Sequence, residues 1–365
     1  LAADAKGYRN HRRDPYLGNG GNLTSTSFRA AWEPDIFGQK RSDADAARAA
    51  ALGSQEQLHG SRLLVSAQIA EHYLRAAHIQ QQQALVSQQL STLHELARYA
   101  AGRFNAGHAT AHDTTAIAAQ IQALQARQST LQAQFDAQQR SIAVLIGQTP
   151  QSFRLDSDAM RQAALLQHLP SPPQGIRPGS LLNQRPDLRA RAAEINARAA
   201  KVASAKADLY PRLTLNFLGN GVLNIDSDNT QKSLISLLGA SLQVPLFTNG
   251  RVQANIDAAD ARLKTALLQY DQTLLQALAD VDNAYQANGA LATQTRLLAQ
   301  ARIEAEKQAT DAEKLYRYGN KTLADTLSAR ISANQNADNH LRSQLAHDQT
   351  LIALYKALGG GWAEK

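Results

Sequence analysis

An internal repeat constrains this chain more than any other feature of its sequence. Residues 1–147 match residues 213–359 without a gap, and every matched pair is 212 positions apart. The matched pairs include Gly7 with Gly219, Tyr73 with Tyr285, Gly107 with Gly319, Asp113 with Asp325, and Gly147 with Gly359. A constant shift across several glycines is hard to produce by chance. The chain is therefore a duplication, and both halves must fold into the same kind of unit.

Each half begins with apolar and polar residues in alternation. Leu213, Leu215 and Phe217 alternate with polar residues, as do residues 238–244 and, in the first half, residues 28–32. This period of two is typical of a strand with one apolar face. Loops rich in Gly, Asn, Asp and Ser separate the paired stretches, and they lie at 18–22 and 224–229. We therefore predict one β-hairpin in each half, and four strands in the chain.

A very long helix is predicted after each hairpin. The hairpins lead through turns that end at Gly38 and Gly250 into apolar positions spaced by three and four, as in a coiled-coil seam. The two long helices are expected over 39–102 and 251–315, each on the order of 90–100 Å in length. Breaks near Gly107 and Gly319 predict returning helices over 113–146 and 325–358.

A proline-rich segment separates the two halves. Its prolines cannot continue a helix, so it is predicted to be an extended connector. A further helix is expected from Arg185 to Asp208, with Pro186 and Asp187 acceptable in its first turn. The predicted organisation is a first repeat over 1–147, a connector over 148–184, a second repeat over 185–359 and a tail over 360–365.

Four strands cannot close a barrel, because about eight are needed before the open edges disappear. Three chains would supply twelve strands, with an apolar outer face and a wet lumen. We therefore expect a mainly α protein with a small β part, whose trimer forms a twelve-stranded outer-membrane barrel continued by a periplasmic α-helical barrel. The alternative is a soluble structural coiled coil, which explains the helices but gives the repeated hairpins no role.

Composition and charge exclude several other classes. The chain has no cysteine, so it has no disulfide or thiolate chemistry. Its net charge is +7, but Lys and Arg are spread among Asp and Glu along the helices, which indicates solvated helix surfaces rather than nucleic-acid binding. One basic cluster, residues 9–13, is expected in an external loop, either in contact with lipopolysaccharide phosphates or simply solvated.

No membrane-spanning helix, signal peptide or catalytic motif is visible. The chain lacks an apolar run of about 18 residues. It begins at Leu1 without a basic or apolar leader, and we expect it to be cut from a longer protein. No phosphate-binding glycine loop, zinc-protease motif or nucleophile elbow is present, so no enzyme is predicted. His108, His112 and Asp113 lack a further strong ligand nearby, and neither a metal nor a cofactor is expected.

Three segments carry a resemblance to a known family. The sequence Leu-Leu-Asn-Gln-Arg-Pro-Asp-Leu at 181–188, followed by Tyr210-Pro211, resembles the signature of the drug-efflux branch of TolC-like outer-membrane factors. The strand-to-helix turns at 32–38 and 244–250 are similar to those of the same family. The resemblance covers essentially the whole chain. It implies that a signal peptide, a helix that mirrors 185–208 and any lipid-bearing cysteine of a lipoprotein precede Leu1.

The resemblance implies a passive conduit for drugs or other small toxic compounds. Such a homotrimer would sit in the outer membrane, extend into the periplasm, and dock with a periplasmic adaptor and an inner-membrane pump of the resistance-nodulation-division type. It implies outer-membrane lipid, and no nucleic acid, as a further partner. Two alternatives stay open: a type I protein-secretion conduit, and a periplasmic coiled-coil structural or interaction protein.

The resemblance also places a gate at the helix-to-helix turns. It implies that Asp325 forms a constriction ring, one carboxylate per chain, and that Tyr316 with Asp113 and Lys321 with His112 hold neighbouring hairpins together. Three like charges in a narrow mouth would attract cations. Two departures weaken parts of this picture: Lys321 stands where some relatives have arginine, and Ser328 stands where some have a second aspartate. The other interpretation of Asp113 and Asp325 is ordinary helix capping.

Overall fold

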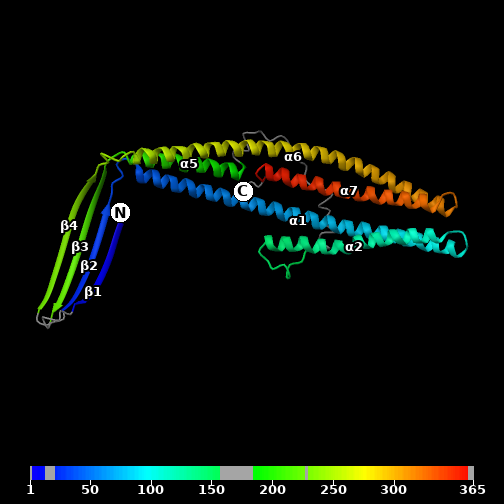
Figure 1. Ribbon diagram of the computed structural model, residues 1–365, viewed down its shortest axis with the longest axis horizontal. Coiled ribbons are helices and arrows are strands. Elements are labelled where there is room, and N and C mark those ends of the chain that lie inside the picture. Colours follow the sequence, from blue (N-terminus) through cyan, green and yellow to red (C-terminus); the bar gives the residue numbers. More distant parts are fainter. Residues whose placement is uncertain (1, 13–20, 157–183, 227–228, 361–365) are drawn as a thin grey trace. The chain divides into compact units, whose positions relative to one another are not determined.

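The computed structural model describes residues 2–12, 21–156, 184–226 and 229–360. The chain is mainly helical with one small sheet, as predicted (Figure 1). In chain order the elements are β1 (Ala2–Arg12), β2 (Gly21–Trp32), α1 (Gln39–Asn105), α2 (Ala111–Leu145), α5 (Pro186–Ala207), β3 (Arg212–Asp226), β4 (Asn229–Gln243), α6 (Arg251–Arg317) and α7 (Leu323–Ala357). In the described part of the chain, no helix combines the length and apolar character needed to cross a membrane.

Two compact units make up the chain, and each takes residues from both repeats. One unit contains Leu1–Ser54 with Ala190–Asp271, and the other contains Gln55–Arg189 with Gln272–Lys365. These units differ from the repeats of the sequence because the strands of the two halves share one sheet and their helical hairpins share a buried cluster. Most of the predicted connector, residues 157–183, and the tail residues 361–365 lie outside the described part.

The sheet of the first unit has the order β1-β2-β3-β4, with all neighbours antiparallel (Figure 1). Residues opposite each other on paired strands share a face of the sheet. Ala30 lies opposite Phe217, which lies opposite Leu238. The alternating apolar residues of β2, β3 and β4 therefore gather on one face. The other face mixes polar residues such as Arg29 and Asn216 with Leu218, Leu237 and smaller apolar residues.

The strands extend further than the sequence predicted. β3 continues to Asp226 and β4 begins at Asn229, so the predicted loop over 224–229 is wrong for most of its length. Similarly, β2 begins at Gly21, and β1 includes the basic segment up to Arg12, so the prediction of a loop is wrong for this segment. A polar composition does not by itself indicate a loop, because polar residues can still form the backbone hydrogen bonds between strands. Arg13 and loop residues 18–20 lie outside the described part.

The helices of the first unit pack along the predicted seam. Val202 and Ala205 of α5 form a buried cluster with Val252, Ile256 and Ala259 of α6. The other side of α5 contacts α1 through polar groups. Lys201 Nζ and Ser204 Oγ donate hydrogen bonds to the Asp43 carboxylate at 2.8 and 2.9 Å. Gly38 and Gly250, the predicted strand-to-helix turns, both have φ of 75° and precede α1 and α6 directly.

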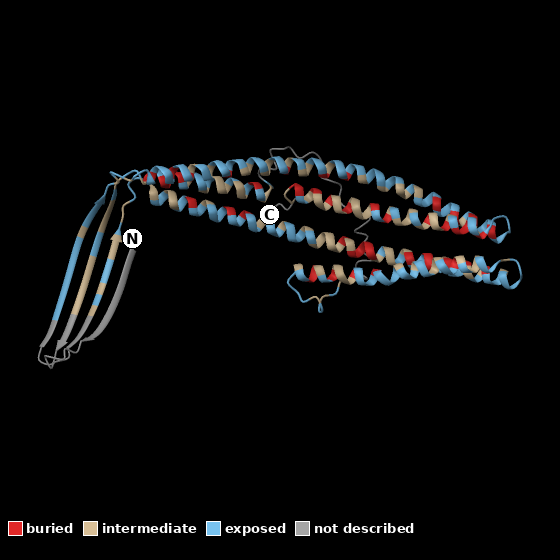
Figure 2. Cartoon of the chain, viewed as in Figure 1, coloured by how far each residue is buried: buried red, intermediate tan, exposed pale blue. Residues whose placement is uncertain are grey.

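The second unit contains two helical hairpins, which the later part of α1 forms with α2 and the later part of α6 forms with α7. Figure 2 shows buried residues along the facing sides of the helices rather than in one thick core. Leu131 and Phe135 of α2 pack against Ala76 and Val86 of α1. Narrow apolar seams of this kind leave the remaining helix surface polar.

Gly359 offers a stability test with a control provided by the repeat. Its φ is +90°, and a Cβ would lie 2.7 Å from the backbone oxygen of Gln184. Gly147, its counterpart in the first half, has φ of +74° and no heavy atom within 4 Å of a Cβ. We expect Gly147→Ala to cost about 1–2 kcal/mol, because left-handed backbone disfavours a Cβ. Gly359→Ala should cost about 2 kcal/mol more, because backbone must also move.

Thermal denaturation of the two glycine variants in detergent checks this difference. Equal melting temperatures would show that the Gln184 backbone adjusts freely to a side chain at residue 359.

Candidate gate at the tips of the helical hairpins

Both hairpin tips have the same local structure. Gly107 and Gly319 have φ of 76° and 82°, which are conformations that a glycine adopts readily. The His108 N–H donates to Arg103 O at 2.8 Å, and the Asn320 N–H donates to Leu315 O at 2.8 Å. These bonds satisfy carbonyls at the ends of α1 and α6. Both helices therefore run two or three residues beyond the bounds that the sequence predicted, and Gly107 and Gly319 lie in the turns, as expected.

Asp113 and Asp325 belong to matching capping boxes. Asp113 Oδ2 accepts hydrogen bonds from Thr110 N at 2.8 Å and Thr110 Oγ1 at 2.9 Å. Asp325 Oδ2 accepts from Thr322 N at 3.3 Å and Thr322 Oγ1 at 2.6 Å. The threonines are the N-caps and the aspartates are third-position residues, so α2 and α7 begin two residues earlier than predicted.

These hydrogen bonds keep both carboxylates charged. The backbone N–H and the hydroxyl of Thr110 lower the pKa of Asp113, and the hydroxyl and backbone N–H of Thr322 lower the pKa of Asp325. Asp325 is exposed at the tip of the second hairpin. Both aspartates therefore cap their helices, and Asp325 remains an exposed negative charge at the hairpin tip.

Tyr316 joins the two hairpins of one chain. It is 4% exposed and packs in a cluster with Leu93, Leu96, Ala100 and Ile117 of the first hairpin. The ring of Tyr99 meets that of Tyr316 edge-on, with 5.5 Å between centroids, and the Arg103 guanidinium lies 5.2 Å from the Tyr316 centroid. The hydroxyl of Tyr99 donates to Arg317 O at 3.1 Å. Sequence reasoning missed Tyr99 and Arg103, although they follow Leu96 on one helix face.

The structure brings Tyr316 and Asp113 near each other without a direct bond. Burial raises the pKa of the Tyr316 hydroxyl, Arg103 opposes this shift, and the charge of Asp113 adds to it. Among the residues that the structure describes, no hydrogen bond or ion pair joins His112 to Lys321, and both side chains are exposed. The nearby Lys321 charge is one of the causes that lower the pKa of Asp325. The pairing of Lys321 with His112 stays a prediction about neighbouring chains.

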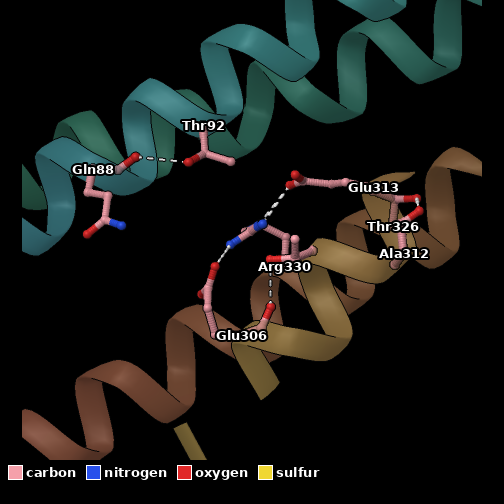
Figure 3. Close-up of polar contacts among 8 residues, drawn as sticks. Gln88, Thr92, Glu306, Ala312, Glu313, Thr326 and Arg330 are labelled. Carbon is pink, nitrogen blue, oxygen red and sulfur yellow. Dashed lines mark hydrogen bonds and ion pairs between the residues drawn. The ribbon is translucent and has the colours of Figure 1, made fainter. Parts of the chain in front are cut away.

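Arg330 forms a buried clamp that sequence reasoning also missed. Its Nε and Nη2 donate to Glu313 Oε1 at 3.0 and 2.8 Å, and its Nη1 donates to Glu306 Oε1 at 2.7 Å (Figure 3). Burial alone would lower the pKa of Arg330, but the two glutamates raise it above its ordinary value. Glu306 and Glu313 are seven residues apart on α6, a spacing that puts both on one helix face and is the only sequence signal of the clamp.

Thr326 adds a second link between α7 and α6 beside the clamp. This residue is fully buried, and its hydroxyl lies 3.3 Å from Ala312 O (Figure 3) and 3.1 Å from Thr322 O. The first hairpin lacks the clamp, because the positions that correspond to Glu306, Glu313 and Arg330 carry His94, Ala101 and Ala118. Within the described ranges, no three His, Asp or Glu side chains come close enough to hold a metal ion.

Comparisons with known proteins agree on one family. The family model described as "Outer membrane efflux protein" matches residues 1–148 and 178–360. The pyoverdine export outer membrane protein OpmQ of Pseudomonas putida is 30% identical over 93% of this chain and 72% of its own length. The cation efflux system protein CusC of Escherichia coli K12 is 24% identical over 92% of this chain and 73% of its own length.

Solved structures share the fold. The outer-membrane channel OprN has a TM-score of 0.82 at 24% identity, covering 99% of this chain and 81% of OprN. The open-state MtrE channel of Neisseria gonorrhoeae also scores 0.82 at 24% identity, covering 99% of this chain and 80% of MtrE. The resemblance to TolC-like outer-membrane factors is confirmed. The chain belongs to the outer membrane efflux protein family and is a channel subunit of an efflux system in the outer membrane.

Proposed function

We propose that three copies of this chain close into one channel, with a twelve-stranded barrel in the outer membrane and a helical tube in the periplasm. The channel is the outer component of a tripartite pump and exports drugs or other small toxic compounds. It works with a periplasmic adaptor and an inner-membrane pump that supplies the energy. The proposal contains no catalytic step.

The observation that carries this proposal is the sheet. Within the described part of one chain, β1 and β4 are edge strands with a free ladder side, and long free edges invite pairing with another chain. Pairing β4 of one copy with β1 of the next removes both kinds of edge when the ring closes. Leu234 and Leu238 of β4 are 85% and 78% exposed on the apolar face, where lipid would cover them.

The cargo is proposed from the range of the relatives' names. Those names include export of pyoverdine, cations, solvents and toluene. Cargoes this different share no recognition chemistry, so we infer that the channel supplies a path and that the pump selects the compound.

The gate forms part of the proposal. Three Asp325 carboxylates, one from each chain, form a negative ring at the periplasmic mouth, while Tyr316, Asp113, Lys321 and His112 hold adjacent hairpins closed. The exposed and charged state of Asp325, and the packing of Tyr316 between the hairpins, support this arrangement.

Planar-bilayer recording of the full-length protein in detergent tests the channel. We expect discrete conductance steps that prefer cations, from a sample whose native mass corresponds to three chains. Heat-denatured protein serves as the control and should give no steps. A folded protein that stays monomeric and never inserts would contradict the proposal.

A further inference from the structure

One pair of residues joins the two hairpins within a chain, and the pair at the corresponding positions of the repeat is exposed to solvent. Within the chain, Tyr316 of the second repeat packs on the first repeat, with the Arg103 guanidinium over its ring. A shift of 212 positions relates Tyr316 to Phe104 and Arg103 to Leu315. Phe104 is 45% exposed and Leu315 is 39% exposed, so both members of the second pair are large apolar residues open to solvent.

We propose that Phe104 of one subunit packs against Leu315 of the next, as the between-chain equivalent of the Tyr316–Arg103 contact. The inference rests on the proposed trimer, in which first and second hairpins alternate around a ring. In such a ring every hairpin has two flanks. One flank of each hairpin is covered within the chain, and the other meets the neighbouring subunit. Because the halves are duplicates with the same tip structure, corresponding residues occupy corresponding flanks.

The chemistry of the second pair differs from that of the first. A cation over a tyrosine ring is replaced by an aliphatic side chain over a phenylalanine ring, and burial of such apolar surface is favourable without any charge. The receiving surface is also smaller, because Ala329 stands where the first hairpin has Ile117. We therefore expect the contact between subunits to be apolar and insensitive to salt. The contact within a chain differs from it because it contains the charged side chain of Arg103.

Site-specific crosslinking tests this contact, because residues 1–365 contain no cysteine. The Phe104→Cys/Leu315→Cys variant of the full-length protein in detergent is treated with a flexible bis-maleimide. The expected products on a denaturing gel are covalent dimers and trimers. The matched control is Arg103→Cys/Tyr316→Cys, which should consume both thiols while the protein keeps monomer mass. If substituting Arg103 and the buried Tyr316 impairs folding, Tyr99→Cys/Arg317→Cys provides a second control within the chain.

The outcomes separate this contact from the proposed function. Native mass spectrometry of the same samples reports whether trimers are present. Suppose that trimers form and the control reacts, but Phe104→Cys/Leu315→Cys stays uncrosslinked or crosslinks only at monomer mass. That result would overturn the contact between subunits and leave the proposed channel unaffected. Absence of any trimer in the folded, unmodified protein would overturn both. Either single-cysteine variant should give no covalent trimer, and a trimer from one cysteine would also refute the pairing.

Discussion

Replacing Arg330 with methionine is expected to lower the unfolding free energy of the protein by about 3 kcal/mol. Arg330 is 6% exposed and donates hydrogen bonds to Glu306 and Glu313 across the α6–α7 hairpin. Methionine fills part of the same volume but leaves the mostly buried Glu313 carboxylate without its partner. An uncompensated buried charge costs more than the ion pair itself contributes. Denaturation in detergent measures the loss, and amide hydrogen exchange over 318–330 localises it to the tip.

Two further variants identify the cause of that loss. Lys314→Ala removes an exposed lysine on the same helix whose ion pair with Asp311, at 3.9 Å, contributes little, so its effect should stay below about 0.5 kcal/mol. Glu313→Gln combined with Arg330→Met removes the stranded charge and should recover part of the stability. If the double variant is no more stable than Arg330→Met, lost packing rather than an unpaired carboxylate is responsible.

Asp325→Asn is expected to reduce the cation preference of single channels by about tenfold, and to raise anion conductance. The substitution removes one charge per chain, hence three charges from the proposed ring. The pKa of Asp325 is lowered by its hydrogen bonds to Thr322, so this charge is present throughout the neutral range. The preference of the wild type should therefore stay constant near neutral pH and fall only under clearly acidic conditions. Reversal potentials in a salt gradient provide the measurement.

The capping role of Asp325 requires its own control. Asp325→Glu keeps the charge and a side chain that suits the third position of a capping box, so it should retain the cation preference. Thr110→Ala weakens the equivalent cap of the first hairpin without removing a charge or a residue of the proposed gate. A fall in selectivity of equal size in Thr110→Ala would attribute the effect to the loosened tips. No change in Asp325→Asn would return Asp325 to an ordinary cap.

Local sequence signals were sufficient for most of the fold. The repeat predicted two equivalent halves, and the alternation around Phe217 together with the long seam from Val252 predicted hairpins followed by long helices. The ends of those helices were wrong by two or three residues. Helix ends depend on which groups satisfy the last free carbonyls and N–H groups, and here the Thr110 and Thr322 caps and the turns at Gly107 and Gly319 do so.

The sequence alone was enough for the duplication, the element types and the acidic residue at each tip, because all of these follow from periodicity and spacing along one chain. Packing in three dimensions placed β2 beside β3, set Tyr316 between Tyr99 and Arg103, and surrounded Arg330 with two glutamates. Such contacts join residues far apart in the chain and depend on which helix faces meet. A pattern of three and four residues shows which face of a helix is apolar, but the partner of that face is chosen by how well the two surfaces fit.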